Sequence, residues 1–158
     1  MKRRELLVAL AAAPSLAAAA PPPGPVVVWP QGVTLLDGRA WEPAPGQAQI
    51  VVFWSTTCPF CRRHNQHVEK LHRALAGRGA AVLGVARDRD PEAVRRYLAA
   101  QGLSFPVTLA AREFAAALSP RNVIPLTITV DRQGRLREAI PGEMFEEDVM
   151  ELVSLTRL

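Results

Sequence analysis

Apolar runs of strand length alternate with longer amphipathic segments from residue 32 onward. The run at residues 50–54 is apolar at every position, which is typical of a central strand that is covered on both faces. Similar runs predict four further strands, at residues 81–86, 105–109, 126–130 and 136–140. A turn at residues 131–134 joins the last two strands into an antiparallel hairpin.

Helices are predicted between these strands, and capping residues and glycines mark their ends. Asp90 and Pro91, for example, are typical of the N-cap and the first turn of a helix. The four predicted helices are residues 57–77, 90–102, 112–118 and 146–157. Strands that alternate with helices imply an α/β fold, with a central mixed sheet flanked by helices. The length of 158 residues allows one ordinary domain of this kind.

Residues 1–20 have the three parts of a bacterial secretory signal peptide. Lys2-Arg3-Arg4 supplies the charged part, residues 6–16 the apolar part, and small residues at the end the cleavage site. Because the apolar part is shorter than the roughly 18 residues that span a bilayer, we expect a cleaved signal and a periplasmic protein. An uncleaved signal would tether the protein to the membrane. The arginine pair leaves both the general secretory and the twin-arginine export routes open.

Half of the 14 prolines fall between residues 21 and 45. The dense cluster at residues 21–25 can form neither a helix nor a ladder strand, so residues 21–31 are predicted to be an extended tether. The folded domain is then expected to comprise residues 32–158. It would begin with a β-hairpin around the turn pair Asp37-Gly38.

The net charge of +4 comes partly from the leader, since the rest of the chain has 16 basic and 14 acidic residues. This balance gives no support for a nucleic-acid partner, and 49% hydrophobic residues exclude a disordered chain. The polar side of the helix that begins at residue 57 could attract acidic partners, but it is expected simply to face solvent. Its charged residues are Arg62, Arg63, Glu69, Lys70 and Arg73.

The two cysteines, Cys58 and Cys61, form a C-x-x-C pair where a buried strand is followed by a helix. Cys58 is predicted at the helix N-terminus, where unpaired amide groups favour its thiolate. This thiolate can attack a disulfide, and Cys61 can resolve the mixed disulfide that results. The alternatives are an inert bridge, which would close too small a loop to stabilise much, and a zinc site with His64 and His67. Zinc is disfavoured because His67 lies about 180° around the helix from Cys58.

Two segments of the chain carry a family resemblance. The first is WSTTCPFC, residues 54–61, and the second is VIPLTITVDRQG, residues 123–134. Together they resemble the thioredoxin superfamily, and most of all the exported TlpA, ResA and CcmG group of thiol-disulfide oxidoreductases. Two matched segments about sixty residues apart are more specific than one C-x-x-C pair. The resemblance begins at residue 32 and includes residues 102–107, within the central insertion that this group adds to the basic fold.

The resemblance implies a thioredoxin-like fold with a site around the dithiol. Pro125 would be a cis-proline that faces the disulfide, and Ile124 would offer backbone groups to an extended substrate strand. Phe60, between the cysteines, is expected to be exposed and to contact partner proteins. His64 stands where many relatives have glutamate, and it is expected to be half buried near the thiols. It is either a proton acceptor for Cys61 or a structural histidine hydrogen-bonded to a neighbouring loop.

The function implied by the resemblance is reduction of protein disulfides in the periplasm. Disulfide-containing exported proteins would be the substrates, in cytochrome c maturation or copper-centre assembly, and a membrane thiol-transfer protein of the DsbD or CcdA type would supply electrons. We expect a monomer without a metal or other cofactor.

Three other functions are weighed against this one. A periplasmic disulfide oxidase or isomerase would use the same dithiol in another direction. A thiol peroxidase is disfavoured because Val51 stands where its motif has proline, and a copper metallochaperone would need methionine ligands near the cysteines.

Overall fold

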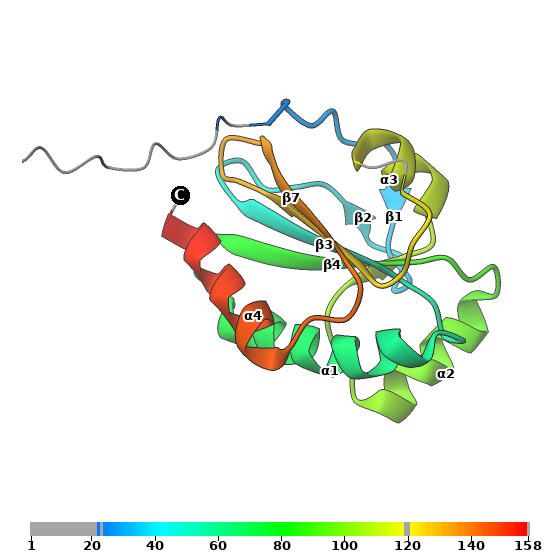
Figure 1. The fold of residues 1–158 in the computed structure, drawn as a ribbon. Helices are drawn as coiled ribbons and strands as arrows, with labels where there is room; N and C mark the ends of the chain where they lie inside the picture. Colours follow the sequence, from blue (N-terminus) through cyan, green and yellow to red (C-terminus); the bar gives the residue numbers. More distant parts are fainter. Residues whose placement is uncertain (1–21, 23, 119–120, 158) are drawn as a thin grey trace, which may run out of the picture.

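Five strands form one mixed sheet in the computed structural model, which describes residues 22, 24–118 and 121–157 (Figure 1). In the spatial order β5-β4-β3-β6-β7, they are β5 (Val107–Thr108), β4 (Ala80–Ala86), β3 (Ala48–Trp54), β6 (Leu126–Val130) and β7 (Leu136–Pro141). A separate hairpin pairs β1 (Val33–Thr34) with β2 (Ala40–Trp41), as predicted. The α/β thioredoxin-like fold is thereby confirmed, while the predicted signal peptide at residues 1–20 lies outside the described residues.

Helices cover both faces of this sheet (Figure 1). They are α1 (Pro59–Ala74), α2 (Pro91–Gln101), α3 (Ala111–Leu118), α4 (Glu146–Glu151) and the 3₁₀ helix η1 (Leu152–Arg157). The helices α1, α2 and α4 with η1 pack on one face, whereas α3 and the β1–β2 hairpin pack on the other. The last predicted helix is therefore α-helical in its first half only, a tightening that is common toward helix C-termini.

The strand β3 lies at the centre of the sheet, parallel to β4 and antiparallel to β6. All seven of its residues are buried, because successive side chains enter different cores. Ile50, Val52 and Trp54 pack in the core beneath α1, and Val51 and Phe53 pack in the core that contains α3. Burial on both faces explains why the sequence is apolar at every position of this run.

The strand β5 is shorter than predicted. The sequence indicated residues 105–109, but only Val107–Thr108 pair with β4. Pro106 has no N–H to donate to β4, so the ladder cannot continue through this residue. The Phe105 N–H lies on the side of the strand away from β4, and it donates to the Glu69 carboxylate at 3.3 Å.

Glu69 is buried, with 5% of its surface exposed, so the prediction that it lies on a solvated face is wrong. Its carboxylate accepts hydrogen bonds from the Ser104 N–H at 2.7 Å and the Ser104 hydroxyl at 2.6 Å, and Arg73 pairs with it at 2.8 Å. Burial by itself would raise the pKa of Glu69, but these hydrogen bonds outweigh it and the pKa is lowered. Glu69 therefore fastens the loop between α2 and β5 to α1.

Part of the segment predicted to be a tether packs against the sheet. The Val27 N–H donates to the Gly134 carbonyl at 2.8 Å, and the Leu136 N–H donates to the Pro25 carbonyl at 3.0 Å. The Val27 side chain is buried. Proline favours an extended backbone, so this segment can pair with the chain at the start of β7. The packed region consequently begins before residue 32.

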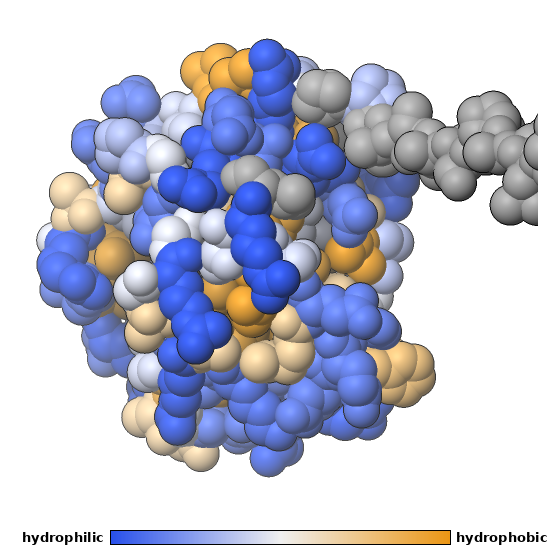
Figure 2. Space-filling model, turned by 90° about the vertical axis from the view of Figure 1, so that its left-hand side faces the viewer, coloured by the Kyte–Doolittle hydropathy of each residue, from blue (hydrophilic) through white to orange (hydrophobic). Residues whose placement is uncertain are grey.

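The surface is largely hydrophilic on the face that Figure 2 shows, which is the left-hand side of Figure 1. In the described part of the chain, no helix is both long enough and apolar enough to span a bilayer. The exposed large apolar side chains among the described residues are Val26, Val28, Phe60, Val123 and Phe145. Two of them, Phe60 and Val123, belong to the surroundings of the cysteine pair.

Candidate active site

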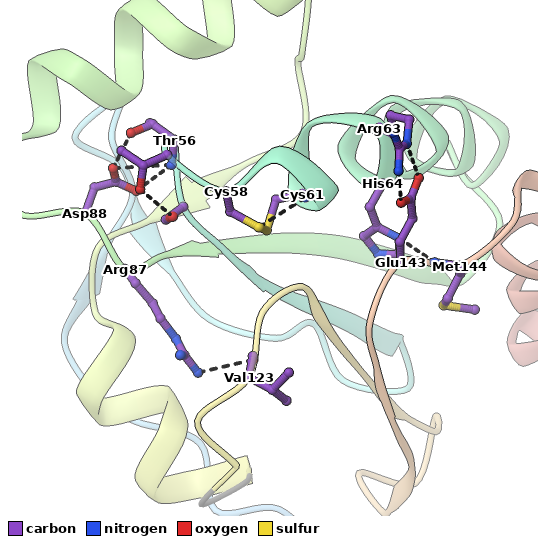
Figure 3. Close-up of a disulfide and its surroundings, with 12 residues drawn as sticks. Thr56, Cys58, Cys61, Arg63, His64, Arg87, Asp88, Val123, Glu143 and Met144 are labelled. Atoms are coloured by element: carbon purple, nitrogen blue, oxygen red, sulfur yellow. Dashed lines mark hydrogen bonds and ion pairs between the residues drawn. A yellow bond between two sulfur atoms is a disulfide. The ribbon is translucent and has the colours of Figure 1, made fainter.

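Cys58 and Cys61 form a disulfide at the start of α1 (Figure 3). Cys58 is the N-cap residue of this helix, and its Sγ accepts a hydrogen bond from the Cys61 N–H at 3.2 Å. The unpaired N–H groups of the first turn and the helix dipole place partial positive charge beside this sulfur. The geometry therefore favours the thiolate form of Cys58 after reduction.

The two cysteines differ in accessibility. Cys58 is half-buried, whereas Cys61 has no exposed surface. Phe60 between them is 59% exposed, and the Arg63 guanidinium carbon lies 5.8 Å from the centre of its ring. An incoming disulfide can therefore reach Cys58 first, with an aromatic side chain beside it.

The Ile124–Pro125 peptide bond is cis, as predicted. The sheet register pairs Phe53 with Leu126, so Pro125 lies at the end of the sheet where β3 leads into the dithiol. Figure 3 shows the loop that carries Val123 across from the disulfide. The topology thus brings together the two segments that carried the family resemblance.

His64 is completely buried, rather than half buried as predicted, because the stripe of α1 that contains it faces the sheet. Its Nδ1 accepts a hydrogen bond from the Met144 N–H at 3.3 Å, and its Nε2 lies 3.0 Å from the Thr127 hydroxyl. Since Nδ1 is an acceptor, we assign the ring proton to Nε2, which donates to Thr127. Burial, and to a lesser extent His67, lowers the pKa of His64 to about 4, so the ring is neutral at pH 7.

The hydrogen bonds of His64 go to groups other than Cys61. Its bond to Met144 joins α1 to the loop before α4, and His67 Nδ1 lies 3.2 Å from the carbonyl oxygen of the same Met144. This arrangement agrees with the second interpretation of His64, a structural histidine that is hydrogen-bonded to a neighbouring loop. The role of proton acceptor stays a prediction, and at Nδ1 it requires the bond from Met144 to open.

Glu143, in the same loop, forms a bidentate ion pair with Arg63. Both donor–acceptor distances are 2.6 Å, and the hydrogen bonds from Arg63 lower the pKa of Glu143. The neighbouring Gly142 N–H donates to the Pro125 carbonyl at 2.8 Å. This loop therefore contacts both the dithiol helix and the proline. Sequence reasoning missed the Arg63–Glu143 pair because no local pattern links residues that lie 80 positions apart.

Arg87 and Asp88, at the end of β4, are two further residues that the sequence did not single out. Asp88 accepts hydrogen bonds from Thr56, in the loop before Cys58, and Arg87 extends to the loop that carries Val123 (Figure 3). A positional signal was available, since functional groups of α/β sheets gather beyond the carboxyl ends of parallel strands.

The arrangement can carry out dithiol-disulfide exchange. One accessible sulfur is placed at a helix N-terminus, and a buried sulfur three residues later is bonded to it. Such a pair can give two electrons to a disulfide or take two electrons from a pair of thiols. Within residues 22, 24–118 and 121–157, no three His, Cys, Asp or Glu side chains are grouped closely enough to hold a metal ion.

Comparison with known proteins supports the same chemistry. The chain matches the Redoxin family over residues 40–154. The thiol-disulfide oxidoreductase ResA of Halalkalibacterium halodurans is 28% identical over 124 residues, which cover 77% of this chain and 70% of that protein. ResA of Geobacillus kaustophilus is 26% identical over 106 residues, which cover 66% of this chain and 60% of that protein.

A solved structure shares the fold. The crystal structure of a thiol:disulfide interchange protein of the thioredoxin family from Chlorobium tepidum matches with a TM-score of 0.74 and 26% identity. The match covers 89% of this chain and 99% of that one.

The fold and the disulfide at the start of α1 define a thiol-disulfide oxidoreductase with a thioredoxin fold. The chain belongs to the Redoxin family, and it is similar to ResA.

Proposed function

We propose that this oxidoreductase reduces disulfides of exported proteins, with Cys58 as the attacking and Cys61 as the resolving cysteine. The observation that carries the proposal is the contrast between them. Cys58 is accessible at the N-terminus of α1, where its thiolate is stabilised, whereas Cys61 is fully buried behind it. This contrast supports an attack that begins at Cys58.

The reaction transfers two electrons from the reduced dithiol to the substrate. The Cys58 thiolate attacks one sulfur of the substrate disulfide, which forms a mixed disulfide and releases the first substrate thiolate. Cys61 then loses its proton and attacks Cys58 Sγ, which closes the Cys58–Cys61 disulfide and releases the second substrate thiolate. The released thiolates take up protons from solvent and from the site.

His64 is the proposed acceptor of the proton that Cys61 loses. Its neutral ring has one nitrogen without a proton, Nδ1, and that nitrogen is held by the Met144 N–H. Proton transfer to Nδ1 of His64 therefore requires movement of the loop before α4. If that loop stays in place, Cys61 gives its proton to another acceptor.

The substrate would lie across the disulfide, between Phe60 and the loop before Pro125. Phe60 offers an exposed apolar ring, and Ile124 is half-buried at the end of the sheet. An extended segment of the substrate would pair with the backbone of Ile124, in the manner of an added strand. This surface would accept an unfolded or extended protein segment with a disulfide rather than a folded partner.

Export and electron supply complete the proposal. The signal-like residues 1–20 would direct the protein to the periplasm, where dithiols are oxidised unless they receive electrons. A membrane thiol-transfer protein of the DsbD or CcdA type would regenerate the dithiol. The substrates would be apocytochrome c cysteines or copper-centre assembly proteins.

Trapping with single-cysteine variants tests the assignment of the two sulfurs. Cys61→Ser should accumulate a mixed disulfide with a disulfide-containing peptide, because Cys58 can attack but nothing resolves the product. Cys58→Ser should reduce turnover of the same peptide to the background rate. Both outcomes can be read by mass spectrometry after acid quenching. Turnover by Cys58→Ser, or an adduct on Cys61 in that variant, would contradict the proposed order of attack.

A further inference from the structure

Arg87 and Asp88 follow the last residue of β4, and their side chains reach two different loops. The Arg87 N–H donates to the Trp54 carbonyl at 2.9 Å, so the ends of β3 and β4 are joined directly before the dithiol loop begins. Adjacent residues of an extended chain direct their side chains to opposite faces of a sheet. Arg87 accordingly lies over Phe53, on the α3 face, with its guanidinium carbon 5.8 Å from the ring centre.

Asp88 holds the loop that leads into Cys58. Its two carboxylate oxygens lie 3.3 and 3.1 Å from the Thr56 N–H, and its Oδ1 also accepts a hydrogen bond from the Thr56 hydroxyl (Figure 3). Thr56 is two residues before Cys58. Hydrogen bonds to a charged acceptor are among the stronger ones in proteins, so these bonds hold Thr56 against the end of β4.

Arg87 holds the loop that leads into Pro125. Its Nη1 donates to the Asn122 side-chain oxygen at 2.8 Å. Its Nη2 points to the backbone carbonyl oxygens of Arg121 at 3.3 Å and Val123 at 3.5 Å. The planar fork of a guanidinium can serve several acceptors at once, which a lysine ammonium on its flexible stem cannot reproduce. Arg87 is also partly withdrawn from water, which strengthens these bonds.

We infer that Arg87 and Asp88 are positioning residues that keep the Cys58 loop and the Pro125 loop in register, so that a bound protein segment presents its disulfide to the Cys58 sulfur. The inference rests on the proposed function, because it assigns substrate binding to the loop before Pro125. The hydrogen bonds of both side chains go to the two loops rather than to the sulfurs. Their effect would therefore fall on substrates that span both loops, and much less on a small disulfide that needs only Cys58.

The test compares two substrates in each variant. The second-order rate constant of the reduced protein is measured by stopped flow with hydroxyethyl disulfide, and with a synthetic peptide that carries one disulfide in an extended segment. Arg87→Gln should lower the ratio of the peptide rate constant to the small-disulfide rate constant by about tenfold, because a shift of the loop by a fraction of an ångström disturbs alignment of the peptide. Arg87→Lys should give an intermediate ratio, and Asn122→Ala, which removes one acceptor, a smaller decrease.

Arg112→Gln is the matched control. Arg112 is exposed on α3 and lines the same surface hollow as Arg87 and Asn122, so it has the same charge and a similar location. The ratio of the two rate constants in Arg112→Gln should equal that of the wild type. A ratio that falls equally in Arg112→Gln would assign the effect to surface charge and overturn the inference.

Other outcomes separate this inference from the proposed function. An unchanged ratio in Arg87→Gln, or an equal loss on both substrates with a lower unfolding midpoint, would overturn the positioning role while wild-type peptide reduction still supports the reductase. Failure of the wild type to reduce the peptide at all would instead contradict the proposed function. Asp88→Asn is a second test. It weakens the hydrogen bonds to Thr56 and should therefore lower the same ratio of rate constants.

Discussion

A single buried ring, His64, shows how one residue can connect stability with the chemistry of the site. The ring is completely buried and hydrogen-bonded on both sides, and its pKa of about 4 lies below the usual value of 6.5. Because the folded protein resists protonation here while the unfolded chain accepts it, the unfolded state binds more protons between these two values. The folded state therefore loses stability as the pH falls through this range.

His64→Gln tests this link, since glutamine keeps hydrogen-bonding groups and does not titrate. The wild-type free energy of unfolding should fall by about 3 kcal/mol more than that of the variant between pH 7 and pH 4. Urea denaturation at intervals across this range gives both curves. Parallel curves would show that His64 is protonated as easily in the folded protein as in the unfolded chain.

At the scale of elements, a buried carboxylate fastens a loop to a helix. Glu69 on α1 accepts hydrogen bonds from Ser104 and Phe105, in the loop before β5. The packing of α1 against this loop therefore depends on a charged group that helical periodicity assigned to the solvent side.

Glu69→Gln should lower the free energy of unfolding by about 1–3 kcal/mol, because the amide has one acceptor oxygen in place of two and no charge, so one of the two groups of donors loses its acceptor. Chemical denaturation of the oxidised protein measures the effect. Glu147→Gln is the control, since Glu147 is exposed and its change should stay within about 0.5 kcal/mol. Equal effects of the two substitutions would refute the fastening role of Glu69.

At the scale of the whole molecule, the direction of exchange depends on how strongly the fold stabilises the Cys58 thiolate. The start of α1 contributes partial charge to this sulfur, but the neutral ring of His64 adds no full positive charge. The positive charge of Arg63, two residues after Cys61, is paired with Glu143. A strongly stabilised thiolate favours the reduced form and makes an oxidant, so moderate stabilisation is typical of a reductant.

A redox titration of the Cys58–Cys61 pair in glutathione and dithiothreitol buffers measures this balance. The midpoint should lie closer to the roughly −270 mV of a thioredoxin-type reductant than to the roughly −120 mV of a strong periplasmic oxidant. A midpoint potential near that of the oxidant would indicate a periplasmic disulfide oxidase or isomerase and not a reductase. The fold and the order of attack would be unaffected.

Local sequence patterns were sufficient for most elements of the fold. The run of apolar residues at 50–54, the cap formed by Asp90 and Pro91 and the turn at Asp37-Gly38 all report interactions within a few residues of themselves. The C-x-x-C pair is equally local, because a helix N-terminus places both cysteines on its first turn. Such features depend on backbone geometry and on the alternation of apolar and polar positions, and both can be read from neighbouring residues of the sequence.

Tertiary structure alone decided which distant residues complete the site and which polar groups are buried. The Arg63–Glu143 pair, the two loops held by Arg87 and Asp88, and the burial of Glu69 join residues separated by 32 to 80 positions. A helical wheel cannot show that a loop 35 residues away will cover Glu69. These contacts depend on the order and direction of the strands, because strand pairing brings remote loops to the same end of the sheet and determines which hydrogen-bonding groups lose their water.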